Sequence, residues 1–327
     1  MSLPDFRLLR PQTLPEAIGV LATHGDQVKV VAGGTDLLPS MKQKLFTPPF
    51  VLDLRGIREL RGIAAMQDGG LSIGALTTLS AVEHSVLIRR DYPVLYEATK
   101  TVASPVLRNM GTIGGNICLD TRCLWYNQSL LWRKSCGFCL KKDGDLCHVA
   151  PSSKTCWAAF SGDTPPALLC LGAELEIAGP NGSRRVPLAE FYVNDGIVRL
   201  RLAPNELVAG VLLPASAKGW RGSYQKLRVR GSIDYPLAGI AVALKIDGDE
   251  VVDARMAITA VNPAPHLVKD AAAQLIGRKV DVETAEAVGE MAARTAKPLT
   301  TSALTPEYRR EMVRVFAKRA LIEAAAN

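Results

Sequence analysis

The chain has few aromatic residues and no long apolar run. Aromatic side chains make up 6% of its 327 residues, too few to build base-stacking platforms for nucleic acid. No stretch of about 18 apolar residues occurs, so no membrane-spanning helix is expected, and residues 1–17 contain no apolar run of signal-peptide length. The net charge of +7 comes from scattered Lys and Arg, which indicates a solvated basic surface that could partly face a negatively charged partner. We expect a cytoplasmic protein that binds neither nucleic acid nor membrane.

Two common glycine motifs of nucleotide-binding proteins are also missing. No GxGxxG and no Gly-Lys dipeptide occurs, which excludes a Rossmann fingerprint and a Walker A loop. Two other glycine turns are present, AGGTD at residues 32–36 and TIGGN at residues 112–116. Each alone is typical of an ordinary tight turn. Together, their backbone N–H groups could converge on the phosphates of a dinucleotide, which glycine allows to approach closely.

The chain is long enough for two or three domains, and its 48% hydrophobic and 22% charged residues are ordinary for a globular protein. Apolar residues at helical spacing follow Thr13, a typical helix cap, and end at Gly25, so a helix is expected between them. Residues 60–82 read as a hairpin-like pair of strands, and residues 111–119 as a glycine-punctuated strand. From about residue 219 the pattern becomes a strand meander followed by helices. We therefore predict two domains, 1–218 and 219–327.

Cysteine is sparse except in one segment, because five of the seven cysteines lie between residues 123 and 156. In the cytoplasm, clustered cysteines are more often metal ligands or redox groups than disulfides. Zinc is one possibility, since Cys136-x2-Cys139 and His148 have suitable spacing, although further ligands would come from wide gaps. An iron–sulfur cluster needs four thiolates at intervals that can be wide. Cys118 and Cys170 are expected to be small core residues.

Four phrases, in the order VVAGGTDLLP, SPVLRNMGTIGGN, DTPPALLCLGAELEI and YQKLRVRGSIDYPLAGIAVAL, resemble the FAD-binding subunits of the molybdenum hydroxylases. The resemblance covers the chain from about residue 4 to residue 320. It implies an α+β fold. Its parts would be a vanillyl-alcohol-oxidase-type (PCMH) FAD-binding domain of two α/β subdomains and a C-terminal three-stranded antiparallel sheet with helices.

The resemblance also implies which residues bind FAD. The first glycine turn would wrap the pyrophosphate, through Val30, Ala32, Gly33, Gly34, Thr35 and Asp36. The second would form another phosphate-side loop, through Thr112, Gly115 and Asn116. Asp163 would reach the ribose or ribityl chain, Leu207 and Lys226 would lie near the flavin ring, and the segment around Val102 would cover it. Taken by itself, Lys226 could also be a surface lysine on a strand.

Compared with ordinary members of this family, residues from about 119 to 160 form an insertion. Its phrases DTRCLWYNQS, CLKKDGDLCHV and KTC resemble the 4-hydroxybenzoyl-CoA reductase branch, whose FAD subunit carries an additional [4Fe–4S] cluster. The resemblance implies four cluster ligands, which are Cys123, Cys139, Cys147 and Cys156. Spacing alone would favour Cys136 together with Cys139, so the role of Cys136 stays open.

A subunit with FAD and a cluster, but no recognisable substrate-activating residues, is expected to transfer electrons and to have no catalytic residue of its own. The resemblance implies a large subunit with the molybdenum cofactor, a small [2Fe–2S] subunit, assembly as a dimer of heterotrimers, and a ferredoxin-like low-potential donor. The first expectation is reductive dehydroxylation of 4-hydroxybenzoyl-CoA or a similar aromatic CoA thioester. The alternatives are the FAD subunit of an oxidative molybdenum hydroxylase and, more distantly, a stand-alone flavin oxidase with a structural zinc loop.

Overall fold

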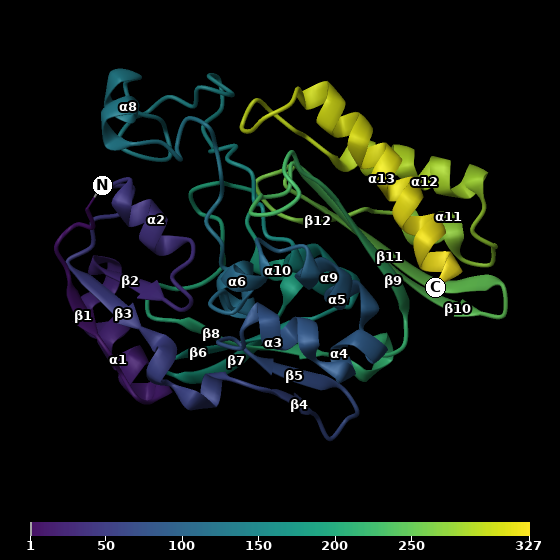
Figure 1. Cartoon of the computed structure of the whole chain (residues 1–327), viewed down its shortest axis with the longest axis horizontal. Helices are drawn as coiled ribbons and strands as arrows, with labels where there is room; N and C mark the ends of the chain where they lie inside the picture. The colour runs from purple at the N-terminus through teal and green to yellow at the C-terminus, as the bar shows by residue number, and fades with distance from the viewer. Residues whose placement is uncertain (1) are drawn as a thin grey trace.

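A computed structural model describes residues 2–327 of the chain. Its strands form three sheets, each covered by helices (Figure 1). The mixture of parallel and antiparallel sheets with separate helical layers confirms the predicted α+β class.

The first sheet is parallel, with the strand order β1-β3-β2. Its strands are β1 (Arg7–Leu9), β2 (Val28–Val31) and β3 (Phe50–Asp53). Helix α1 (Leu14–His24) buries Ala17, Ile18 and Leu21 in the core beside this sheet. The side chain of Thr13 caps its N-terminus, and Gly25, with a φ of 52°, ends it, so this predicted helix is confirmed. Helix α2 (Leu37–Lys42) follows the first glycine turn.

The second sheet is antiparallel and has five strands in the order β4-β5-β8-β6-β7. These strands are β4 (Ile63–Ala65), β5 (Leu71–Gly74), β6 (Glu174–Gly179), β7 (Gly182–Pro187) and β8 (Leu207–Leu213). The helices that accompany them are α3 (Leu79–His84), α4 (Val86–Asp91), α5 (Pro93–Lys100), α6 (Pro105–Arg108), α7 (Ile113–Ile117), α9 (Thr164–Cys170) and α10 (Leu188–Phe191). Strand β8 is buried along its whole length because it lies in the middle of the sheet.

One expectation about this region is wrong and another is only partly right. Residues 111–119 contain the short helix α7 rather than a strand, because the Thr112 hydroxyl accepts a hydrogen bond from the Gly115 N–H at 3.1 Å and caps the first turn. The hairpin expected over residues 60–82 is confirmed as β4 and β5 but is shorter than expected, since Thr78 caps helix α3 in the same way. In both places a threonine cap outweighs a pattern that was read as strand.

The third sheet has the order β12-β11-β10-β9 and is antiparallel. It consists of β9 (Arg221–Leu227), β10 (Ala238–Asp247), β11 (Glu250–Thr259) and the two-residue strand β12 (His266–Leu267). The first three are the expected long strands, and β12 adds a short edge. One face carries α11 (Ala271–Leu275), α12 (Val282–Thr295) and α13 (Pro306–Ala326) (Figure 1). Among residues 2–327, no helix combines the length and apolar character needed to cross a bilayer.

Strand β10 joins the two predicted domains because both of its faces are buried. Ile240, Val242 and Leu244 pack under the C-terminal helices, whereas Ala241 and Ala243 pack into the core of the five-stranded sheet. Successive side chains of a strand point to opposite faces, so one strand serves two cores. The boundary expected at residues 218 and 219 falls between β8 and β9.

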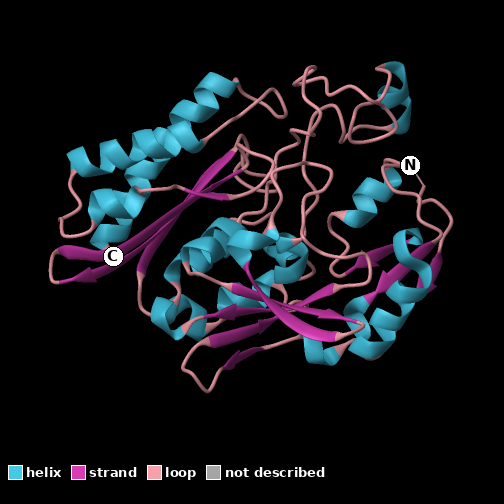
Figure 2. Cartoon of the chain, turned by 180° about the vertical axis from the view of Figure 1, so that it is seen from behind, coloured by secondary structure: helices cyan, strands magenta, loops and turns pink. Residues whose placement is uncertain are grey.

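The segment predicted to be an insertion, called the cysteine arm below (residues 119–160), is mostly loop and contains only one helix, α8 (Leu130–Ser135) (Figure 2). Its two ends are joined by backbone hydrogen bonds between Arg122 and Ala159, at 2.7 and 2.8 Å. The Leu124 N–H donates to the Thr301 carbonyl at 2.8 Å, which attaches the arm to the C-terminal domain. The arm therefore leaves and rejoins the fold at one place.

The loop that receives the arm is held by Arg309, a fully buried residue of α13. Its guanidinium donates to the carbonyls of Leu237, Ala260 and Leu299, at 2.9, 2.6 and 2.9 Å. Burial lowers the pKa of Arg309 to about 10. One side chain thus ties the start of β10, the end of β11 and the loop before α13.

Replacing Arg309 should destabilise the protein, because three carbonyls would lose their donor. An unsatisfied buried polar group costs about 1–3 kcal/mol, and relief of the buried charge offsets part of that sum, so we expect Arg309→Leu to lower the free energy of unfolding by about 3 kcal/mol. Urea unfolding measures the effect. The neighbouring exposed Arg310 is the matched control, and Arg310→Leu should change stability by less than about 0.5 kcal/mol. Equal effects of the two changes would contradict the assigned role.

Candidate functional site

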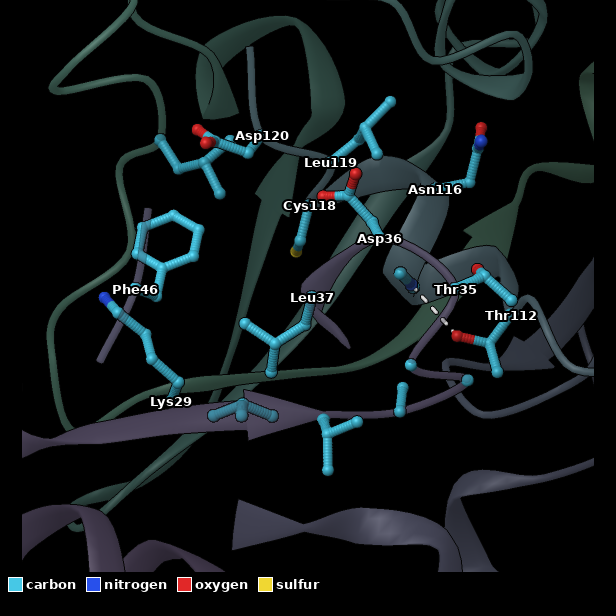
Figure 3. Close-up of a pocket in the computed structure, with 18 of the residues that line it drawn as sticks. Lys29, Thr35, Asp36, Leu37, Phe46, Thr112, Asn116, Cys118, Leu119 and Asp120 are labelled. Carbon is cyan, nitrogen blue, oxygen red and sulfur yellow. Dashed lines mark hydrogen bonds between the residues drawn. The ribbon is translucent and has the colours of Figure 1, made fainter. Parts of the chain in front are cut away.

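The two glycine turns are in direct contact. A Cβ atom on Gly33 would lie 2.0 Å from the carbonyl oxygen of Met110, so no other residue fits there without moving the backbone. Gly34 has a φ of 76°, which also favours glycine. Figure 3 shows Thr35 and Asp36 of the first turn facing Thr112 and Asn116 of the second. The turns thus come from two subdomains and form one wall.

A cavity of about 1380 Å³ opens along these turns. Every residue predicted to bind FAD lines it except Lys226: Val30, Ala32, Gly33, Gly34, Thr35, Asp36, Val102, Thr112, Gly115, Asn116, Asp163 and Leu207. Cys118, expected to be a core residue, also faces this cavity (Figure 3), and burial raises the pKa of its thiol to about 11. Cys170 is fully buried in α9. A volume of this size is sufficient for a dinucleotide.

Lys226 lies behind the cavity wall rather than in it. Its ammonium is buried, 2.9 Å from one carboxylate oxygen of Asp163, and donates to the Thr101 carbonyl at 3.0 Å. The hydroxyl of Tyr224 donates to the other oxygen of Asp163 at 2.7 Å. Lys226 is therefore not a surface lysine. It fixes the orientation of Asp163, the group that reaches the cavity.

A second polar group at the cavity was not anticipated from the sequence. Arg122 donates to the carboxylate of Asp36 at 2.8 Å, the Tyr235 hydroxyl donates to the same oxygen at 3.2 Å, and the guanidinium lies 4.3 Å from the Tyr235 ring centroid. Burial raises the pKa of Asp36, and Arg122 offsets this only in part. Asp36, Arg122 and Tyr235 come from the first glycine turn, the cysteine arm and the C-terminal domain. No local pattern links positions so far apart in the chain.

The cysteine arm encloses a second, small cavity of about 20 Å³. Four buried cysteines line it: Cys123, Cys139, Cys147 and Cys156. Trp125 packs beside them and stacks on His148, with ring centroids 4.3 Å apart. Cys136 does not line this cavity, because it lies at the C-terminal end of α8. The structure thus separates Cys136 from Cys139, although the two are close in sequence.

Two of the four thiols have pKa values that are raised by their surroundings. Burial raises the pKa of Cys123 to about 12, and the other three sulfurs add to that rise. Burial likewise raises the pKa of Cys156 to about 11. All seven cysteines are free in the structure. Within residues 2–327, no three His, Cys, Asp or Glu side chains lie close enough together to hold a metal ion, so metal binding by the four cysteines stays a prediction.

Asp120 lines the large cavity and is held by three polar side chains, two of which also line the small cavity. Asp120 accepts hydrogen bonds from Lys141 at 2.8 Å, from Tyr126 at 2.9 Å and from Arg199 at 3.1 Å. Burial raises the pKa of the Asp120 carboxyl, but the two nearby cations outweigh this and hold the pKa below its usual range. Figure 3 shows Asp120 at the upper end of the large cavity. The carboxylate is therefore charged and shared by groups on both sides.

Family comparisons assign both parts of the chain. Residues 4–216 match the family described as "FAD binding domain in molybdopterin dehydrogenase", and residues 222–324 match "CO dehydrogenase flavoprotein C-terminal domain". Together these matches cover nearly the whole chain, including the large cavity and the third sheet.

Individual proteins give the same assignment. The carbon monoxide dehydrogenase medium chain of Afipia carboxidovorans is 30% identical, over 99% of this chain and 98% of its own. The aldehyde oxidoreductase FAD-binding subunit PaoB of Escherichia coli is 34% identical, over 80% of this chain and 83% of its own. A chain of reconstituted CO dehydrogenase from Oligotropha carboxidovorans superposes with a TM-score of 0.83 at 28% identity, over 100% of this chain and 99% of that one. The chain belongs to the FAD-binding medium subunits of the molybdenum hydroxylase family, and it is an FAD-binding oxidoreductase subunit.

Proposed function

We propose that this chain is the electron-transfer subunit of a molybdenum hydroxylase in which FAD lies across the two glycine turns. The proposal rests on the large cavity, which runs along the two glycine turns where Gly33 contacts Met110. The relatives are named medium chain and FAD-binding subunit, which supports partner subunits carrying the molybdenum cofactor and [2Fe–2S] clusters. The dimer of heterotrimers is part of this proposal.

Bound FAD would supply a carrier of one or two electrons. The chain's own part is to bind and orient it. Backbone N–H groups of the two turns would hold the pyrophosphate, since glycine lets the phosphates approach closely. Asp163, fixed by Lys226 and Tyr224, would accept a hydrogen bond from a ribose or ribityl hydroxyl. Val102 and Leu207 would exclude water from the rings.

Adding one methyl group at Gly33 should therefore abolish tight FAD binding. Gly33→Ala places its Cβ against the Met110 carbonyl and must push the turns apart, so we expect the Kd for FAD to rise at least tenfold. Fluorescence titration of the apoprotein measures it. Gly19→Ala is the matched control, because a Cβ there meets no atom within 4 Å and the residue lies inside α1. A Gly33→Ala protein with unchanged FAD affinity would refute the proposed cradle.

We further propose that Cys123, Cys139, Cys147 and Cys156 hold a [4Fe–4S] cluster. What supports this is that the four buried cysteines line one cavity, in which aromatic and aliphatic side chains pack beside them. No group of three His, Cys, Asp or Glu side chains among residues 2–327 is already arranged to hold a metal ion, so the four thiols would have to rearrange to bind either zinc or a cluster. At about 20 Å³ the cavity would have to widen around it, which a loop with little regular structure allows.

Two cysteine variants test the assignment of the cluster ligands. Cys139→Ser should remove most of the iron and the cluster absorbance while FAD stays bound, because the two cavities are separate. Cys136→Ser should keep about four irons per chain, since this thiol lies outside the small cavity. Anaerobic purification followed by iron and flavin analysis distinguishes them. Loss of iron from Cys136→Ser, or zinc in place of iron in the unchanged protein, would show that the assignment is wrong.

The direction of electron flow has two candidates. The relatives are named dehydrogenases and an oxidoreductase, which favours an oxidative hydroxylase whose electrons leave the molybdenum subunit through FAD. The reductive candidate, removal of a phenolic hydroxyl from an aromatic CoA thioester, is supported by one observation, the resemblance of the cysteine arm to that branch. A cluster in the arm suits exchange with a one-electron carrier such as a ferredoxin in either direction. A stand-alone flavin oxidase with a zinc loop has no support from the comparisons.

Assays of the assembled complex decide between these candidates. An oxidative hydroxylase should reduce a dye acceptor with an aldehyde, carbon monoxide or a nitrogen heterocycle as substrate. A reductive enzyme should instead use reduced viologen to convert 4-hydroxybenzoyl-CoA to benzoyl-CoA, consuming two electrons and two protons and releasing water. Viologen-driven loss of the hydroxyl group, without dye reduction by the oxidisable substrates, would overturn the oxidative direction.

A further inference from the structure

Two residues of the cysteine arm lie between the flavin cavity and the small cavity and line both. They are Tyr126 and Lys141, and both side chains are almost completely buried. Tyr126 packs in one apolar cluster with Cys123, Cys139 and Cys156. A group in either cavity would therefore face the other across these two side chains.

The Lys141 ammonium is fixed in this partition. It donates to Asp120 at 2.8 Å, to the Gly196 carbonyl at 2.9 Å and to Thr121, and it lies 4.4 Å from the centroid of the Tyr126 ring. Its charge cannot turn toward solvent without breaking all of these contacts. A cation held in a buried site acts more strongly on its neighbours than one in water.

The charges around Asp120 leave a net positive field. Asp120 is paired with Lys141 and also with Arg199, so two cations share one carboxylate. The Tyr126 hydroxyl uses the other carboxylate oxygen. Lys141, which lines the small cavity together with the four cysteines, is therefore a cation whose charge Asp120 neutralises only in part.

We propose that Lys141 sets the electron balance between the two redox groups, with Tyr126 as the packing element that keeps water out of the partition. This inference rests on the [4Fe–4S] cluster proposed above. A cluster held there would become more negative on taking up one electron, and the fixed Lys141 cation would stabilise that state. Transfer of this electron to bound FAD would oxidise the cluster by one electron and reduce the flavin by one. No bond forms or breaks at Lys141, and no proton is needed there.

The test is an anaerobic redox titration of FAD- and iron-loaded protein, followed by the electron spin resonance of the reduced cluster. Lys141→Gln removes the charge. We expect the equilibrium constant for one-electron reduction of the cluster to fall about tenfold, which lowers its reduction potential by about 59 mV. Lys141→Arg keeps the charge, so its cluster should have a reduction potential close to that of the unchanged protein. Lys154→Gln is the matched control, because Lys154 lies two residues before Cys156 but is exposed to solvent.

Asp120→Asn provides a second measurement in case Lys141→Gln does not retain its cluster. It keeps the Lys141 charge and removes the negative partner, so the potential should move in the opposite direction, upward. A purely structural role for Lys141 would lower iron content while leaving the potential of the remaining clusters unchanged.

Two results overturn the inference. One is a fully loaded Lys141→Gln protein whose potential matches the unchanged protein. The other is a Lys154→Gln protein whose shift equals that of Lys141→Gln, since that would show a general effect of charge. If the unchanged protein itself lacks four irons per chain, the proposed cluster is wrong, and this outcome is separate from the other two.

Discussion

The contact between Gly33 and the Met110 carbonyl determines how the rest of the site is built. It brings a turn that follows a parallel strand against a turn that precedes a helix of the antiparallel subdomain. Because a Cβ would lie 2.0 Å from the carbonyl oxygen, only glycine permits the approach. The large cavity runs along this seam, with its remaining walls supplied by Val102, Asp163 and Leu207. A cofactor placed there would hold the two subdomains together as well as be held by them.

Polar anchors, rather than a large core, order the cysteine arm. A loop this long with one short helix needs fixed points. They lie at its base, where Arg122 pairs with Ala159, and at the C-terminal domain, where Leu124 bonds to Thr301. A third is the buried Arg133, which donates to the Lys44 carbonyl at 2.9 Å. The first anchor closes the base of the arm, and the other two attach it to the C-terminal and N-terminal parts of the fold.

The sequence predicts the parts of this site that depend on local chemistry. The capped helix α1 and the glycine turns follow from residue types within a few positions of one another. Helix α7 was missed because its Thr112 cap precedes only five helical residues, too few to show a helical period. Spacing alone also groups Cys136 with Cys139, whereas in the fold Cys136 directly follows α8, which ends at Ser135, and does not line the small cavity that Cys139 lines.

The sequence alone did not predict the hydrogen bonds between residues that are far apart in the chain. The bond between Asp36 and Arg122 joins residues 86 positions apart, and the one between Asp36 and Tyr235 spans 199. Such contacts depend on how the three sheets are packed, which no local pattern specifies. Lys226 shows the same limit, because the family phrase identified the residue but not its position behind Asp163.

The place where the arm joins the chain explains why its cavity lies next to the flavin. Asp120 lines the large cavity and Cys123 lines the small one. Three residues of chain span at most about 11 Å, so any group held by Cys123 must lie close to the flavin wall. An arm inserted at the exposed hairpin between β6 and β7 would meet no such requirement. The insertion point therefore suits a redox group that exchanges electrons with FAD, and this holds for electron flow in either direction.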